Sequence, residues 1–264
     1  MTIISYISHS KNENYSLLRI LGIIPARYHS SRFPGKPLVE IAGKTMIHRV
    51  YDQCRKATKL TDIVVATDDE RIASHVTHSI QGNVVMTSPD HLSGTERVAE
   101  AYRQQLESGV ADYDYVVNIQ GDEPLIKPEL IDDLCDLLNY KTEIATAAKR
   151  IEDVATLFDP NVVKVVLTMR KMALYFSRQA IPFVREAPTD LWLEHAEFFK
   201  HIGIYAFRTD VLDQIVKLPE NVLENTEKLE QLRWLGYGYK IIVKETEHDS
   251  VGIDTPEDIK KLII

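Results

Sequence analysis

Three cationic side chains lie close together near the start of the chain, in a protein whose net charge is −8. They are Arg27, Arg32 and Lys36. Pro34 and Gly35 stand among them, and an apolar run with the length of a buried strand, residues 20–24, ends before them at Pro25. Like charges held this close repel one another unless an anion binds between them. Open α/β sheets bind phosphate groups in loops at the carboxyl ends of their strands, so the stretch indicates a phosphate site.

A P-loop is the first alternative, and the residue spacing excludes it. Lys36 is followed by Pro37 instead of serine or threonine. The run Gly43-Lys44-Thr45 has Leu38 where the first glycine of a P-loop should stand. A solvated turn, whose charges serve only solubility, remains the second alternative.

Two acidic residues are expected at the same edge of the sheet. Asp122 follows an apolar strand, residues 115–119, on a glycine turn. A carboxylate repels a polyphosphate unless a cation lies between them, and Mg²⁺ prefers one or two carboxylates together with phosphate oxygens and water. Asp254 is the second candidate, because Pro256 at a first helical position makes Thr255 the cap and leaves the Asp254 carboxylate outside capping. A turn-forming Asp122 and a capping Asp254 are the structural alternatives.

Two further polar runs have a simpler interpretation available. Asp112 and Asp114 have the D-x-D spacing of glycosyltransferase metal sites, but they precede their strand and so fall at the opposite edge, as a surface turn. Ser93 and Glu96 have the capping-box spacing. The amides of that first helical turn, with the hydroxyls of Ser93 and Thr95, could cap the helix, face a nucleotide, or do both.

Strand-like and helix-like segments alternate between residues 20 and 150. The expected strands are residues 63–67, 84–86, 115–119 and 144–148, and the expected helices are residues 45–57, 69–80, 93–108 and 128–138. This alternation predicts an α/β fold with a mostly parallel or mixed central sheet flanked by helices, in which Asp68 caps the second helix. From residue 151 the alternation stops, which predicts a smaller β-rich insert over residues 151–210 before the chain returns to the α/β domain at 211–264.

The composition narrows the functional classes. The acidic balance argues against nucleic acid as a partner. Cys54 and Cys135 lie far apart on the apolar faces of expected helices, which indicates free thiols in a reducing, cytoplasmic compartment and no cysteine metal site. Residues 1–19 are expected to form a poorly ordered extension with neither a signal-peptide pattern nor a membrane span.

The run from Pro25 to Leu38, P-A-R-Y-H-S-S-R-F-P-G-K-P-L, resembles the signature of the 3-deoxy-manno-octulosonate (KDO) cytidylyltransferases, also called CMP-KDO synthetases. The sialic-acid cytidylyltransferases have a looser version. Later runs match the KDO family in the same order: Ser93-Gly-Thr-Glu-Arg97, Asn118-Ile-Gln-Gly-Asp-Glu-Pro124, Lys200-His-Ile-Gly-Ile-Tyr205, Leu229-Glu-Gln-Leu-Arg233 and Gly252-Ile-Asp-Thr-Pro-Glu-Asp258. The match covers about residues 20–264.

The resemblance implies a nucleotide-diphospho-sugar transferase-like fold and the conversion of CTP and KDO to CMP-KDO and diphosphate, for lipopolysaccharide biosynthesis. It implies Mg²⁺ on Asp122 and Asp254, with Arg27 and Lys36 completing the catalytic set. The nucleotide-binding residues would be Pro25, Ala26, Arg27, Arg32, Lys36, Ser93, Thr95 and Gln120. The sugar-binding residues would be Gln120, Arg178, His201, Tyr205, Glu230 and Gln231. The insert would cap the sugar site and form the contact of a homodimer.

Without the family, these sugar-site residues have ordinary explanations. His201 and Tyr205 are two strand periods apart and share a face, but a lone histidine is more often structural. Glu230 and Gln231 would lie on the solvated face of a helix capped near Asn225. The large apolar side chains of the insert fit a local core or a subunit interface equally; they are Trp192, Leu193, Phe198 and Phe199.

The sequence is compatible with other functions. The same chemistry on the 8-amino analogue of KDO is hardly distinguishable, and a sialic acid is less favoured because Pro34-Gly-Lys-Pro-Leu38 matches the KDO family closely. A nucleotide-binding protein without turnover is disfavoured by the presence of both Asp122 and Asp254. Ser31 and Phe183 depart from the family's usual threonine and tryptophan, and the second departure touches the sugar pocket.

Overall fold

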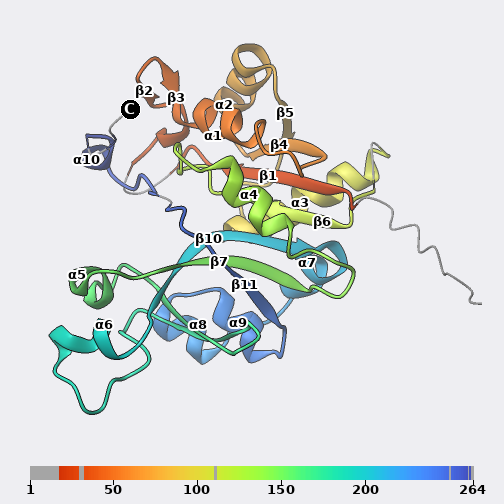
Figure 1. Cartoon of the computed structure of the whole chain (residues 1–264). Coiled ribbons are helices and arrows are strands. Elements are labelled where there is room, and N and C mark those ends of the chain that lie inside the picture. The colour runs from red at the N-terminus through yellow and green to blue at the C-terminus, as the bar shows by residue number, and fades with distance from the viewer. Residues whose placement is uncertain (1–17, 30–32, 110–111, 250, 261, 263–264) are drawn as a thin grey trace, which may run out of the picture.

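The computed structural model describes residues 18–29, 33–109, 112–249, 251–260 and 262 of the chain. Nine strands within these ranges form one mixed sheet, in the order β11-β7-β10-β6-β1-β4-β5, with β8 and β9 attached beside β10 (Figure 1). The strands of the sheet are β1 (Ile20–Ala26), β4 (Asp62–Thr67), β5 (Asn83–Met86), β6 (Tyr115–Asn118), β7 (Ile144–Arg150), β8 (Lys164–Leu167), β9 (Ala173–Ser177), β10 (Phe199–Arg208) and β11 (Ile241–Glu245). A small hairpin, β2 (Glu40–Ile41) and β3 (Lys44–Thr45), stands apart.

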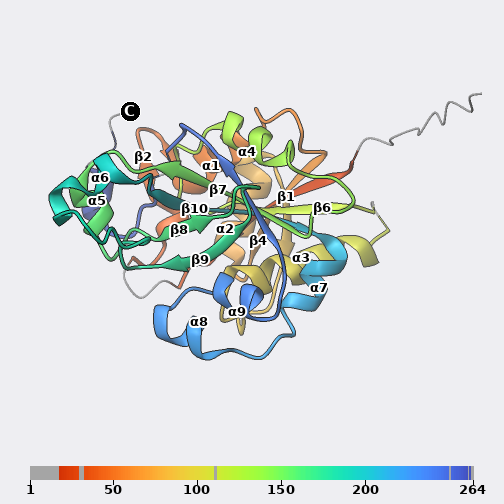
Figure 2. The same cartoon turned by 60° about the horizontal axis from the view of Figure 1, so that its bottom comes forward.

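Helices cover both faces of the sheet, as the alternation predicts (Figures 1 and 2). The α-helices are α1 (Met46–Cys54), α2 (Glu70–His75), α3 (Gly94–Glu107), α4 (Pro128–Cys135), α5 (Val154–Phe158), α6 (Trp192–His195), α7 (Thr209–Ile215), α8 (Val222–Glu227), α9 (Gln231–Gly236) and α10 (Pro256–Ile259). Short 3₁₀ turns are η1 (Lys36–Leu38) and η3 (Thr189–Leu191), and a π-helical turn, η2 (Val76–Ile80), extends α2. The α/β class predicted from the sequence is confirmed.

Alternating side chains of the strands build a core on each face. Leu21 and Ile23 of β1 pack on the side of α3, with Val98 among their neighbours. Ile20 and Ile24 pack on the other side, which α1 and α4 cover. The same second core contains the free thiols Cys54 and Cys135, and burial raises the pKa of the Cys135 thiol to about 12. Both cysteines are therefore inert core residues. None of the described helices combines the length and the apolar character that crossing a membrane requires.

β10 departs from the expected layout. We predicted an insert over residues 151–210, yet β10 runs antiparallel between β7 and β6 in the middle of the main sheet. The part of the chain that stands outside the sheet's centre is therefore shorter and ends before Phe199. The error arose because an antiparallel strand between parallel ones returns from a distant segment, and local alternation does not reveal it.

The helix caps confirm some sequence predictions and correct others. Ser93 caps α3 and Thr255 caps α10, as expected. Asp69, instead of Asp68, caps α2, and its carboxylate accepts the Arg71 amide. Asn221 caps α8, so Asn225 lies inside that helix, and α9 begins separately after Lys228 in the left-handed conformation.

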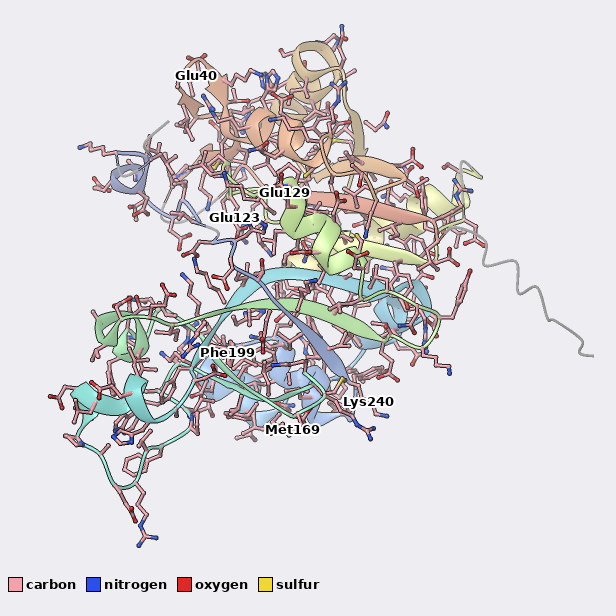
Figure 3. The ribbon with its side chains drawn as sticks, in the orientation of Figure 1. Glu40, Glu123, Glu129, Met169, Phe199 and Lys240 are labelled. Carbon is pink, nitrogen blue, oxygen red and sulfur yellow. The ribbon has the colours of Figure 1, made fainter. Side chains whose placement is uncertain are left out.

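Trp192 and Phe198 lie in a small core of their own beside the sheet, with Ile151 and Leu157. The two aromatic rings stack with centroids 6.0 Å apart. Phe183 contacts the Trp192 ring from outside and is 74% exposed. In Figure 3, Phe199 marks the start of β10 and Met169 the turn between β8 and β9, where Met169 is 99% exposed.

Candidate active site

A pocket of about 200 Å³ lies at the carboxyl ends of β1 and β6, where the sequence predicted a phosphate site. Its lining residues come from the basic loop after β1, the start of α3 and the turn after β6. They are Pro25, Ala26, Arg27, Lys36, Pro37, His91, Leu92, Ser93, Gly94, Arg97, Gln120, Gly121 and Asp122. The pocket thus joins most of the predicted nucleotide-binding residues, and Arg32 lies outside the described residues.

The basic loop is folded back on itself at Gly35. Its amide donates to the Tyr28 carbonyl at 2.8 Å, and its φ of 73° is a left-handed conformation that glycine tolerates best. A Cβ at Gly35 would also lie within 3.3 Å of the Tyr28 ring. The fold-back turns η1, and with it Lys36, toward the edge of the sheet, while Arg27 remains exposed at the pocket.

Lys36 joins the two acids that the sequence placed at this edge. Its Nζ lies 2.7 Å from Asp122 Oδ2 and 3.6 Å from Asp254 Oδ1, and it donates to the Ile253 carbonyl at 2.7 Å. The Ile253 amide donates in turn to the Asp122 carbonyl at 2.9 Å. The structure therefore brings Asp122 and Asp254, which are far apart in the chain, to the same ammonium group.

The turn that carries Asp122 is packed tightly on the end of β1. A Cβ at Gly121 would lie 2.6 Å from the Pro25 carbonyl oxygen, so only glycine fits there. Gln120, on the same turn, donates to the Gly203 carbonyl of β10 at 2.9 Å. The position of Asp122 is consequently fixed by the sheet on both sides.

The two carboxylates suit a magnesium ion whose coordination the phosphate oxygens of a nucleotide would complete. Among the described residues no cluster of three or more His, Cys, Asp or Glu side chains could enclose a metal. Two carboxylates at the edge of a phosphate pocket are nevertheless what Mg²⁺ takes from proteins, because it keeps waters and binds phosphate oxygens. The ammonium group of Lys36 already lies between these carboxylates, which shows that a cation is accommodated there.

Glu230 connects the start of α3 with α9. Its carboxylate accepts from Ser93 Oγ at 3.1 Å and from Thr95 Oγ1 at 2.6 Å. Burial raises the pKa of Glu230, while the two hydroxyl donors oppose that shift. Ser93 also accepts the Glu96 amide, but the Glu96 carboxylate accepts from Leu92, so the expected reciprocal capping box is absent. A residue expected at the sugar thus contacts two residues expected at the nucleotide.

Arg97 is a pocket residue for which the sequence predicts no role. It is buried on α3 and donates to Thr87 Oγ1 at 2.5 Å and to Asp68 Oδ2 at 3.1 Å. Because the Asp68 carboxylate pairs with Arg97, it does not cap α2. His91, another pocket residue, contacts the Glu100 carboxylate. The available signal was helical spacing, because Arg97 lies one turn after Ser93 on the same face.

Apart from Gln120, the predicted sugar-binding residues lie on β10, directly after β9 and at the start of α9. The His201 and Tyr205 rings are 5.2 Å apart despite a bulge between Ile202 and Tyr205, so the shared face is confirmed. Gln231 is buried at the start of α9. Arg178 follows β9, and its guanidinium donates to the carbonyls of Glu227 at 2.8 Å and Pro160 at 3.1 Å.

Lys164 holds the segment around Arg178, a role that the sequence does not predict. Its ammonium group is buried and donates to three carbonyls, those of Asp159, Val162 and Arg178, at 2.9, 2.7 and 2.6 Å. Buried ammonium groups require such partners. Lys164 therefore fixes the loop before β8 against the end of β9, where Arg178 lies.

The stability of the protein should depend on pH through His201. Burial lowers the pKa of His201 from 6.5 to about 3. Below pH 6.5 the unfolded chain binds a proton at this residue and the folded protein does not, so the contribution of the neutral ring is full above pH 6.5 and is lost as the pH falls toward 3. In His201→Asn, the fall in the free energy of unfolding below pH 6.5 should be smaller by about 1 kcal/mol per pH unit.

Urea unfolding at a series of pH values measures this difference. His78→Asn, at an exposed position on η2, is the matched control and should keep the wild-type slope. An unchanged slope in His201→Asn would contradict the shifted pKa.

Comparison with known proteins places the chain in a family. Residues 21–242 match the cytidylyltransferase family. The 3-deoxy-manno-octulosonate cytidylyltransferase of Cytophaga hutchinsonii is 51% identical over 248 residues, which cover 94% of this chain and 97% of that protein. The chain belongs to this family. The 3-deoxy-manno-octulosonate cytidylyltransferase of Parabacteroides distasonis is 50% identical over 252 residues, covering 94% of this chain and 98% of that protein.

Solved structures agree with this membership. A CMP:2-keto-3-deoxy-manno-octonic acid synthetase complexed with CTP has a TM-score of 0.84 at 39% identity, and the match covers 92% of this chain and 96% of that one. A 4-diphosphocytidyl-2C-methyl-D-erythritol synthase has a TM-score of 0.62 at 14% identity, which shows a shared fold alone. The 3-deoxy-manno-octulosonate cytidylyltransferase family thus accounts for both the sequence motifs and the sheet topology.

Proposed function

We propose that this protein converts CTP and KDO to CMP-KDO and diphosphate, and so supplies activated sugar for lipopolysaccharide biosynthesis. The observation that carries the proposal is the meeting of Lys36, Asp122 and Asp254 at one end of the pocket after β1. That arrangement offers both a cation for phosphate oxygens and two carboxylates for a divalent ion. The names of the close relatives and the CTP complex of a similar synthetase support the choice of substrates.

In this proposal the phosphate end of the pocket neutralises charge. Arg27, Arg32 and Lys36 bind the triphosphate, and their positive charge stabilises the departing diphosphate. Asp122 and Asp254 would hold Mg²⁺, which when bound would supply positive charge at the phosphate groups and lower the pKa of the sugar hydroxyl. The task of the protein's own residues is to align the two substrates for in-line attack of the sugar hydroxyl.

The other end of the pocket and the neighbouring elements orient the substrates. Pro25, Ala26, Ser93 and Thr95 would contact the nucleoside. The residues proposed to orient the sugar acid are Gln120, Arg178, His201, Tyr205, Glu230 and Gln231. Support comes from Gln120, which lines the pocket and contacts β10, and from Glu230, which contacts both Ser93 and Thr95.

Two properties of the whole protein belong to the same proposal. Exposed apolar side chains between β8 and α6, Met169, Leu174 and Phe183, support a homodimer formed through this region. Two buried free thiols support a reducing, cytoplasmic location.

Parallel assays with three sugar acids test the function. The protein is incubated with CTP and Mg²⁺ and with KDO, its 8-amino analogue or a sialic acid, and diphosphate release is measured against a sample without sugar. We expect the highest kcat/KM with KDO. A higher value with the 8-amino analogue would change the substrate and keep the reaction, whereas no release with any of the three would reject the function.

A further inference from the structure

We propose that Thr146 holds His201 in the tautomer whose Nδ1 is unprotonated, so that Nδ1 accepts a hydrogen bond from a hydroxyl group of the sugar acid. The inference rests on the proposed function for the identity of the ligand. Thr146 itself lies on β7 and is a positioning residue, because it acts through His201.

The hydrogen bonds of Thr146 determine which ring nitrogen carries the proton. Its fully buried hydroxyl oxygen lies 2.7 Å from the Ile204 carbonyl and 2.9 Å from His201 Nε2. A hydroxyl has one proton, and an oxygen–oxygen distance of 2.7 Å to a carbonyl, which cannot donate, requires the proton there. The hydroxyl must therefore accept from the ring, and His201 carries its proton on Nε2.

The ring is neutral under ordinary conditions. Burial lowers the pKa of His201 to about 3. A neutral imidazole that donates from Nε2 has a lone pair on Nδ1. No partner for Nδ1 occurs in the described part of the chain, where Phe176 and Tyr205 are the rings that pack against His201.

The Tyr205 hydroxyl lies beside the same threonine. It is buried, and the Thr146 side chain is its hydrogen-bonding neighbour. Thr146 therefore contacts both His201 and Tyr205, the two residues of β10 expected at the sugar acid. The opposite tautomer of His201 would present a donor, instead of an acceptor, to a sugar hydroxyl.

Nitrogen NMR tests the tautomer without turnover. In protein labelled with ¹⁵N-histidine, the His201 signals, assigned by their loss in His201→Asn, should show a protonated Nε2 and an unprotonated Nδ1 in the wild type and in Thr146→Ser. In Thr146→Val, which lacks the accepting oxygen, the form protonated on Nδ1 should become populated. A wild-type ring protonated on Nδ1 would overturn the proposal.

Kinetics test what the tautomer does. Thr146→Val should raise the KM for KDO by about tenfold and leave the KM for CTP unchanged, whereas Thr146→Ser should keep both. In the His201→Asn background Thr146→Val should have no further effect, because asparagine has no tautomers. An equal rise in both backgrounds would show that Thr146 acts only through the backbone of the bulge, and would overturn the proposal.

A replacement variant and an activity-independent readout keep the proposal testable. Thr146→Ala also lacks the hydroxyl and replaces Thr146→Val if thermal unfolding shows that the valine variant is not folded. If the wild type turns over none of the sugar acids, the proposed function fails, while the ring signals still decide the tautomer.

Discussion

Asp122→Asn should lower kcat for CMP-KDO formation by on the order of 100- to 1000-fold, a loss typical of essential electrostatic groups. Asparagine keeps the size of the side chain but removes the charge that would hold Mg²⁺ and that pairs with Lys36 at 2.7 Å. The glycine turn and the backbone hydrogen bond to Ile253 do not involve this carboxylate, so the fold should remain intact. Diphosphate release and circular dichroism measure the two properties.

Asp114→Asn is the matched control for this substitution. Asp114 also adjoins β6, but it lies at the other end of the strand, where its carboxylate accepts the Arg19 amide. The control should retain wild-type kcat. Wild-type turnover in Asp122→Asn, or an equal loss in both variants, would remove Asp122 from the metal site.

Lys36→Met should have two opposite effects. Turnover should fall by about 100-fold, because the triphosphate loses a cation that is 13% exposed at the pocket. At the same time the nucleotide-free protein should bind Mn²⁺, an EPR-visible substitute for Mg²⁺, about tenfold more tightly. The reason is that the ammonium group lies between Asp122 and Asp254 and competes with a divalent ion for both carboxylates.

Lys44→Met controls for the loss of a lysine near the same loop. Lys44 pairs with Asp52 at 2.5 Å, away from the pocket, and its removal should change neither turnover nor Mn²⁺ affinity. Unchanged or weaker Mn²⁺ binding in Lys36→Met would mean that the carboxylates do not share a cation site, even if turnover falls.

The site at the sheet edge was predictable because each part follows a local rule. Lys36 and Asp122 follow buried strands and glycine turns, and parallel strands bring such turns to one edge. Asp254 was predictable from its place before a proline-initiated helix. The sequence reveals these residues because their position depends on the backbone near them.

The features that the sequence did not predict depend on contacts between distant segments. Asp68 and Asp69 are equivalent as caps in the sequence, and the distant Arg97 decides between them by pairing with Asp68. The place of β10 depends on pairing with β6 and β7, which no local pattern encodes. Thr146 appears in the sequence as an ordinary strand residue, because its hydrogen bonds arise only from the bulge opposite it.

The hydrogen bond from the Ile253 amide to the Asp122 carbonyl makes the site dependent on the segment that follows β11. The last strand of the sheet ends at Glu245, so proteolytic clipping soon after it would leave every strand in place and remove Asp254. Such a clipped protein would lose Ile253, which packs against Ile41 and Met46, and would keep only half of its acid pair. The integrity of residues 252–254 is therefore a condition for the arrangement of acids around Lys36.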